Sequence, residues 1–255
     1  MELIVLGGTL VLSLALAVGG AAWLLSGLLR VMRGRAAMIL LVLAVVPTLR
    51  ATTPNTAEPT FQRFLTRQEP PHPYRAVRRL EAENGSRQGW LEATTEYSAN
   101  GVFRYQITAE GGSSQIRSRV LKAVLDGESS VIALGEAARS SLAPDNYIFQ
   151  SQGVDADGLA NVLLSPRRKE RALLSGVMFL RPGEGELVRV QGRLARNPSF
   201  WVRDVDIVRK YSRIHGAVVP VAMESQAKIR FLGPASFRMT YRYLEIDGHA
   251  IASDR

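Results

Sequence analysis

Two apolar runs open the hydropathy pattern of this chain of 255 residues. The first extends from Leu3 to Leu29 without a charged residue. At about 1.5 Å rise per residue, a helix of that length crosses a hydrocarbon core of about 30 Å. Three arginines follow within residues 30–35, and a shorter apolar run then covers residues 36–49. The length of the second run is typical of the apolar region of a signal peptide.

These two runs allow two interpretations. In one, the protein begins at Met32 and is cleaved near Ala51 after export. In the other, the runs form a helical hairpin whose arginine loop stays in the cytoplasm. Both place the chain from about residue 52 onward outside the cytoplasmic membrane. We therefore expect a periplasmic protein of the cell envelope, either cleaved near Ala51 or anchored in the cytoplasmic membrane by residues 3–49.

The rest of the pattern divides the chain into further segments. Residues 1–51 hold the transmembrane segment and the signal-peptide-like segment, and residues 52–60 form a polar, proline-bearing linker. A single folded domain is predicted over 61–250, followed by a short tail over 251–255. About 200 residues are enough to bury one substantial core.

Helical spacing of apolar residues appears twice near the start of this domain. The first predicted helix is short and covers residues 61–65, before a proline-rich stretch. The second covers Tyr74–Glu83, where Tyr74, Val77 and Leu80 fall on one helical face. Asn84-Gly85 is expected to end that second helix.

Two more helices are predicted between residues 113 and 144. Apolar residues repeat at intervals of three and four over 116–125, which indicates an amphipathic helix. Ser113 or Ser114 is expected to cap its start and Gly127 to end it. The apolar positions over 131–142 predict another helix, ended by Pro144.

The remaining segments alternate with the period of a β-strand. Gly89–Ser98 and Phe103–Thr108 flank Asn100-Gly101, which is a strong hairpin signal. No later interval is long enough for a crossover helix, so neighbouring strands are expected to pair antiparallel. The pattern therefore predicts an α+β fold, a long antiparallel meander with helices in its concavity. The later strands are predicted at Tyr147–Gly153, Leu159–Ser165, Ala172–Leu180, Leu187–Ala195, Phe200–Tyr211, Val218–Phe231 and Phe237–Ile246.

Aromatic and methionine side chains alternate along several of these strands. Such side chains fill irregular apolar space and adapt to ligands of variable shape. They either pack the helices onto the sheet or line an apolar cavity where the helices leave sheet surface uncovered. The cavity candidates are Phe103, Tyr105, Met178, Leu180, Trp201, Met223, Phe237, Met239 and Tyr241.

The candidate chemistry of the chain is sparse. It has no cysteine, which excludes disulfides and thiol nucleophiles. None of its three histidines, His72, His215 and His249, has metal-site spacing. A nucleophile elbow, a phosphate loop and a dinucleotide motif are also missing. The sequence therefore predicts a protein that is not an enzyme and uses no metal and no cofactor.

The charge is strongly positive, at +9 with an isoelectric point near 10.3. Basic residues cluster within 75–79, 166–171 and 209–213. These clusters are interpreted either as solvated surface or as contacts with the anionic headgroups of a membrane surface. Nucleic acid is not expected as a partner of an exported protein.

Three segments resemble a known family. They are FLRPGEGELVRVQGRLA (Phe179–Ala195), VDIVRKYSRIHGAVVPVAMES (Val205–Ser225) and GPASFRMTYRYLEIDG (233–248). Together they are similar to the LolA/LolB/RseB-like superfamily of periplasmic lipoprotein carriers and lipid-sensing domains. The resemblance covers residues 60–250 in the order of the elements.

This resemblance implies an unclosed antiparallel half-barrel whose helices act as a lid. Its apolar inner face would bind acyl chains of a lipid or lipoprotein, and the protein would act as a monomeric carrier or chaperone without catalytic residues. The lipid-anchored form of LolB-type carriers requires a cysteine, which this chain lacks. The alternative is a membrane-tethered protein-interaction or envelope-sensor module of RseB-like type.

Overall fold

The computed structural model describes residues 57–67, 70–200, 202–230 and 233–252. The predictions for residues 1–51, and the role predicted for Trp201, lie outside these ranges. None of the helices in the described ranges combines the length and the apolar character that crossing a membrane requires.

The described residues form a large sheet and a few helices. The helical elements are α2 (Ala57–Thr66), α3 (Ser114–Ile116), the π-helical segment η2 (Arg117–Leu121), α4 (Lys122–Ala133) and the 3₁₀ segment η3 (Glu136–Ser140). The strands are β1 (Tyr74–Asn84), β2 (Arg87–Tyr97), β3 (Phe103–Gly112), β4 (Tyr147–Val154), β5 (Ala160–Pro166), β6 (Leu174–Arg181), β7 (Glu186–Leu194), β8 (Val202–Ile214), β9 (Ala217–Ile229), β10 (Gly233–Ile246) and β11 (His249–Ala250).

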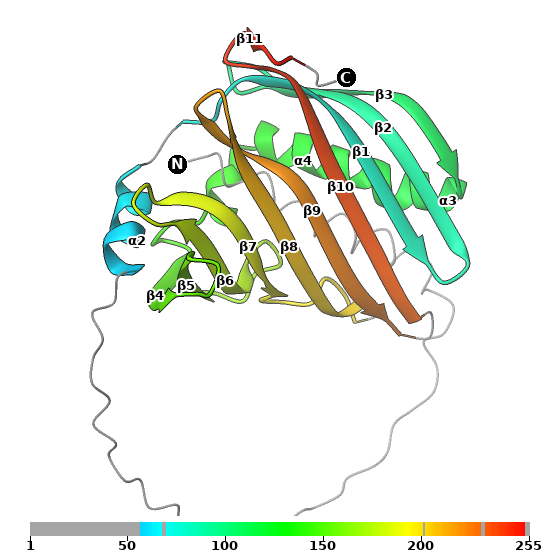
Figure 1. Ribbon diagram of the computed structural model, residues 1–255. Coiled ribbons are helices and arrows are strands. Elements are labelled where there is room, and N and C mark those ends of the chain that lie inside the picture. The colour runs from blue at the N-terminus through cyan, green and yellow to red at the C-terminus, as the bar shows by residue number, and fades with distance from the viewer. Residues whose placement is uncertain (1–56, 68–69, 201, 231–232, 253–255) are drawn as a thin grey trace, which may run out of the picture.

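The sheet is antiparallel and does not close. Its strand order is β3-β2-β1-β10-β9-β8-β7-β6-β5-β4, with β11 added to β10. Antiparallel pairing of β1 with β10 joins the first hairpins to the end of the long meander, so β3 and β4 become the two edges. Figure 1 shows the sheet curving around α4, while α2 lies beside β4–β6. The predicted α+β class, an unclosed antiparallel sheet with few helices, is confirmed.

One predicted helix is wrong. The segment 74–83 forms strand β1, and Asn84-Gly85 turns it into β2 as a hairpin. Its buried positions alternate strictly, but one of them is occupied by Arg78. That charged residue interrupts the apolar alternation, so Tyr74, Val77 and Leu80 stood out at helical spacing instead.

The ends predicted for the next two helices are also wrong. Helical structure continues from Ser114 to Ala133 through Gly127, and only the short segment η3 follows it. A glycine inside a helix costs about 1 kcal/mol relative to alanine. The buried side chains of Val124, Leu125 and Glu128 on both sides of Gly127 offset that cost by packing against the sheet. The helix ends instead before Gly135, which has a φ of +65°.

The strand predictions after residue 87 are confirmed, with ends moved by a few residues. Gly101, at a φ of +77°, turns β2 into β3 as the Asn-Gly signal predicted. All neighbouring strands pair antiparallel, as expected from the short connections between them.

Candidate functional site

The concave face of the sheet is defined by the register of its strands. Residues paired across antiparallel strands project their side chains on the same face. One continuous row crosses seven strands from β1 to β5, and its members are mostly apolar and buried. In sheet order this row is Leu80, Met239, Met223, Arg209, Val190, Met178 and Val162.

Two helical coverings divide this face into two parts. The part made by β1–β3 and β8–β10 is covered by α3, η2 and α4, and we call it the α4 half. The part made by β4–β7 is covered by α2, and we call it the α2 half. Each part holds its own cluster of buried apolar side chains.

A charged pair is buried at the centre of the α4 half. Arg78 on β1 and Glu128 on α4 are both 0% exposed. The guanidinium donates to both carboxylate oxygens of Glu128, through Nη1 at 2.6 Å and Nη2 at 2.9 Å. This two-pronged contact ties the helix to the floor of the sheet in one defined position.

Aromatic rings enclose the Arg78 guanidinium. Its central carbon lies 4.6 Å from the ring centre of Tyr241, 5.1 Å from that of Phe103 and 5.8 Å from that of Tyr74. The Tyr74 hydroxyl also accepts a hydrogen bond from Arg78 Nη2. These contacts replace water around a cation whose burial would otherwise be costly.

The electrostatics of this centre keep Arg78 charged and the nearby phenols neutral. Burial lowers the pKa of Arg78, but the adjacent Glu128 carboxylate outweighs burial, so the pKa lies above its usual value. Burial raises the pKa of Tyr241 to about 12 and also raises the pKa of Tyr74 and Tyr243. The centre of the α4 half is therefore a polar network rather than an empty apolar space. Both terminal nitrogens of Arg78 have partners in it, whereas the buried Nε has none among the described residues.

The α2 half has a different character. Its inward side chains are mostly apolar. The exceptions include the hydroxyl of Tyr147, which accepts a hydrogen bond from the Leu174 amide, the hydroxyl of Tyr211, and Ser151 on β4. α2 covers them mainly with Ala57 and Phe61, and the Phe61 ring lies 5.0 Å from that of Phe149. No carboxylate in the described residues pairs with a cation across this contact between α2 and the sheet.

α2 also touches the turn between β6 and β7. Gly185 lies at a φ of +69°, and a β-carbon there would come within 2.7 Å of the Phe64 amide nitrogen. The same β-carbon would lie 2.8 Å from the Thr60 carbonyl oxygen. Glycine therefore allows the turn to approach the helix backbone, and the Gly183 carbonyl accepts a hydrogen bond from Arg63.

The predicted cavity residues that the structure describes all lie within or beside the packed interior. Met178 and Leu180 belong to the α2 half. Met223, Phe237 and Met239 are buried in the α4 half, with Tyr105 and Tyr241 packed against them. Phe103 is buried against Arg78. Their role in binding a ligand stays a prediction.

Sequence reasoning missed the pair of Arg78 and Glu128. The signal for each was present, because Arg78 is two residues from Leu80 and has the same strand parity. Glu128 follows Leu121, Val124 and Leu125 at helical spacing on the buried face. A charged residue at an inward position of each pattern indicates a partner across the core.

Arginines of the predicted basic clusters form individual contacts with neighbouring residues. Arg75 pairs with Glu245 at 3.4 Å, and Arg79 pairs with Glu81 and Glu92. In the second cluster, Arg167 donates to the Pro144 carbonyl oxygen and Arg168 to the Asn146 side chain, both at 2.7 Å. In the third, Arg213 pairs with Glu186 at 2.9 Å. Contact of these clusters with a membrane surface stays a prediction.

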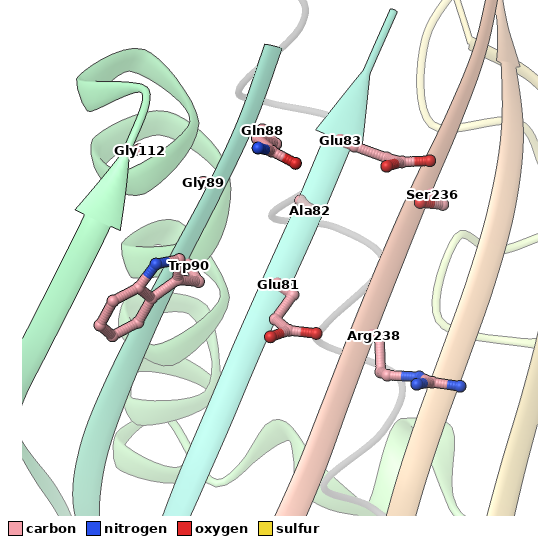
Figure 2. Close-up of a pocket in the computed structure, with 9 residues that line it drawn as sticks. All are labelled: Glu81, Ala82, Glu83, Gln88, Gly89, Trp90, Gly112, Ser236 and Arg238. Carbon is pink, nitrogen blue, oxygen red and sulfur yellow. The ribbon is translucent and has the colours of Figure 1, made fainter. Parts of the chain in front are cut away.

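A shallow pocket lies on the convex face, near the ends of β1, β2 and β10. Figure 2 shows Glu81, Glu83, Trp90 and Arg238 around it, on the side of the sheet away from the helices. The pocket has a volume of about 510 Å³ and a mixed polar and apolar lining. In the described part of the chain, no group of three His, Asp or Glu side chains is placed to hold a metal ion.

Comparisons with known proteins bear on the fold. No protein-family model matches the chain, and no curated protein matches it in sequence. Among solved structures, it is similar to a LolA superfamily protein from Nitrosomonas europaea, with 8% identity over 77% of this chain and 94% of that one and a TM-score of 0.42.

Two other solved structures are similar at comparable identity. A domain assigned to outer membrane lipoprotein sorting in Vibrio parahaemolyticus has 12% identity over 73% of this chain and 93% of that one, with a TM-score of 0.42. The complex of MucA and MucB from Pseudomonas aeruginosa has 10% identity, 73% and 93% coverage, and a TM-score of 0.22. These likenesses have identities of at most 12% and TM-scores below 0.5, so they concern the arrangement of the elements alone and say nothing about a role.

Proposed function

We propose that this protein binds acyl chains of a lipid or lipoprotein without catalysing a reaction, and that the chains enter the α2 half of the concave face. The observation that supports this most is the contrast in covering. The inward surface of β4–β7 is mostly apolar, and it is covered by one helix of ten residues together with Leu142 from the segment before β4. An acyl chain that displaces Phe61 would replace apolar contacts with apolar contacts, at little net cost.

The covering helix is suited to move. α2 buries only Ala57, Thr60 and Phe61, whereas α3, η2 and α4 bury four apolar side chains and are joined to β1 by the Arg78–Glu128 pair. α2 begins at Ala57, a few residues after the segment that we expect to be cleaved or membrane-bound. Motion of α2 would open the α2 half while the α4 half keeps the sheet in shape.

Photocrosslinking of the full chain tests this proposal. The protein, purified in a detergent-free polymer, is incubated with palmitate that has a diazirine on its chain, irradiated and digested for mass spectrometry. We expect adducts on inward residues of β4–β7 and on α2. Adducts confined to residues 1–56, or labelling at background level, would overturn the proposal.

The periplasmic location is part of this proposal. Fusion of alkaline phosphatase after residue 67 tests it, because that reporter is active only outside the cytoplasm. Activity of the fusion supports export, and N-terminal sequencing of the mature protein then separates cleavage near Ala51 from anchoring by residues 3–49. An inactive fusion that is made in normal amounts contradicts export.

A second candidate function, a protein-interaction module, is favoured by one edge of the sheet. In the described residues β4 pairs only with β5, and its sequence, YIFQSQGV, has no charged residue. Ile148 on this strand is 54% exposed. Natural edge strands usually have charges or prolines that prevent pairing with other chains, so an extended partner segment could add here as a further strand.

A photoreactive amino acid placed at Gln150 tests this second function in living cells. The matched control places it at Glu224, on the convex face in the middle of the sheet. Protein adducts at position 150 and none at position 224 are expected for an interaction module. Equal labelling at both positions contradicts an edge-specific partner.

A further inference from the structure

Arg209 occupies an unusual place on the concave face. It lies on β8 in the row described above, between Val190 on β7 and Met223 on β9. Val190 belongs to the cluster of the α2 half and Met223 to that of the α4 half. The Arg209 side chain therefore lies at the boundary between the two coverings, where it is only partly buried.

The guanidinium of Arg209 has weak partners. Nη1 is 3.5 Å from the Tyr211 hydroxyl, and Nη2 is 3.7 Å from the Met223 sulfur. No carboxylate in the described residues lies within ion-pair distance of it. The carboxylate of Glu128, in the same interior, accepts both of its short hydrogen bonds from Arg78.

The comparison with Arg78 shows what Arg209 lacks. Both arginines occupy inward positions on neighbouring parts of the same sheet. Arg78 has a carboxylate that matches the planar fork of its guanidinium, which is the geometry that binds carboxylates and phosphates best. Burial of an arginine among apolar side chains costs free energy. For Arg209 this cost is offset by Tyr211, Tyr241 and the charge of Glu128, which leave its pKa raised, but no carboxylate binds its planar fork. A protein that keeps this charge at the boundary gains from it when an anion binds there.

We propose that Arg209 binds the anionic head of an amphiphile whose apolar chain lies in the α2 half. This inference rests on the proposed function and narrows it to ligands with an oxyanion head. Val190 is the neighbour of Arg209 in the row, and it belongs to the cluster of the α2 half. The head and the chain of one ligand can therefore be bound together. The oxyanion is either the carboxylate of a fatty acid or the phosphate of a phospholipid.

Two probes that differ only at the head test the inference. Diazirine-bearing palmitate has a carboxylate, and the matched diazirine-bearing hexadecanol is uncharged. For the wild-type full chain we expect palmitate to label β4–β7 at least tenfold more efficiently than hexadecanol does. Arg209→Met should reduce palmitate labelling about tenfold, to the level of hexadecanol, and leave hexadecanol labelling unchanged.

Three variants separate the charge from the packing of this side chain. Arg209→Lys keeps a cation but loses the planar fork, so palmitate labelling should fall by less than it does for methionine. Arg209→Gln is the polar, uncharged replacement and should behave as methionine does. Lys210→Met removes the exposed charge of the next residue, on the opposite face, and should change neither probe.

The outcomes distinguish this inference from the proposed function. Equal labelling of β4–β7 by both probes in the wild type and in Arg209→Met overturns the role of Arg209, while acyl binding stands. Labelling of β4–β7 by neither probe overturns both. Competition by unlabelled oleate, but not by phosphatidylglycerol, assigns the oxyanion to a fatty acid, and the reverse result assigns it to a phospholipid. Competition by neither, despite charge-dependent labelling, contradicts both of these sources.

Discussion

The two halves of the concave face are covered in different ways. In the α4 half, a long helical segment is joined to the sheet by directional bonds between Arg78 and Glu128, inside a ring of aromatic side chains. In the α2 half, a short helix lies on mostly apolar side chains, and the described residues include no such pair there. Both halves belong to one sheet and face the same way, so the difference lies in the cover.

This difference shows that one fold can hold one covering helix in a fixed position and leave another covering helix able to move. Apolar packing is not directional, and a helix held by it alone can slide or leave when another apolar group takes its place. A buried ion pair favours one arrangement, because every other arrangement leaves charges without partners. We therefore interpret the α4 half as the part that keeps the sheet in one arrangement and the α2 half as the part that can open.

The largest expected effect comes from removing one partner of the buried pair. Arg78→Met leaves Glu128 buried without a cation and should lower the free energy of unfolding by about 3–5 kcal/mol. The double variant Arg78→Met/Glu128→Leu removes both charges and should recover most of that loss. Urea unfolding of the two variants measures the difference.

The control for this prediction is Arg79→Met, at the next residue of β1. Arg79 is on the convex face and pairs with Glu81 and Glu92 at partly exposed positions. Its replacement should cost no more than about 1 kcal/mol. If the double variant is as unstable as Arg78→Met alone, the pair is not the isolated unit that the structure indicates, and the contrast between the halves loses its main support.

A smaller effect is expected from the apolar cover. Phe61→Ala removes the main anchor of α2 and should cost about 3 kcal/mol, at the low end for a buried phenylalanine because the helix can move toward the gap. Hydrogen exchange should accelerate in β4–β6 and stay unchanged in β1 and β10. Gln62→Ala, at an exposed position of the same helix, should have little effect on either measurement. Faster exchange throughout the sheet would show that the halves do not open separately.

Much of this architecture could be predicted from the sequence, because it depends on local alternation. The strands from β4 to β10 and the hairpin of β2 and β3 alternate clearly, and Gly101 marks the turn. β1 could not be predicted in this way, since Arg78 occupies one of its inward positions. The inward position of the Arg78 charge is explained by its contact with Glu128, which lies fifty residues later in the sequence.

The candidate site depends even more on contacts distant in sequence. The pairing of Leu80 with Met239 joins β1 to β10, and it decides which strands form the edges. Likewise, the contact of Phe61 with Phe149 places α2 over one half of the face. Methionine and aromatic patterns predicted an apolar inner surface, but they do not reveal where helices cover it. Arg209 was assigned to a basic surface cluster for the same reason.

Alkaline pH gives a third way to separate the halves. Tyr74, Tyr241 and Tyr243 surround the α4 half or its border, and burial raises the pKa of each, to about 12 for Tyr241. Above pH of about 10 the unfolded chain loses phenol protons that the folded chain retains. The free energy of unfolding therefore keeps its full value below pH 10. It falls as the pH rises toward 12, by about 1.4 kcal/mol per pH unit for each tyrosine.

Urea unfolding at several pH values, combined with hydrogen exchange, measures this loss. β1 and β10 should loosen at lower pH than β5 and β6, although burial also raises the pKa of Tyr147 in the α2 half. Tyr241→Phe should reduce the slope of the free energy of unfolding against pH, between pH 10 and 12, by the contribution of one tyrosine. An unchanged slope in that variant would mean that Tyr241 does not retain its proton as its burial implies.

The smallest effect is expected at an ion pair that resembles Arg78–Glu128 in composition but lies on the convex face. Arg238 contacts Glu224 at 3.1 Å, and both side chains are at least 40% exposed. Water and salt screen this pair, so Arg238→Met should change the free energy of unfolding by less than about 1 kcal/mol. Measured beside Arg78→Met, it isolates burial as the cause of the larger effect. A loss as large as that of Arg78→Met would mean that charge pairing itself, and not the covered position, gives the larger effect at Arg78.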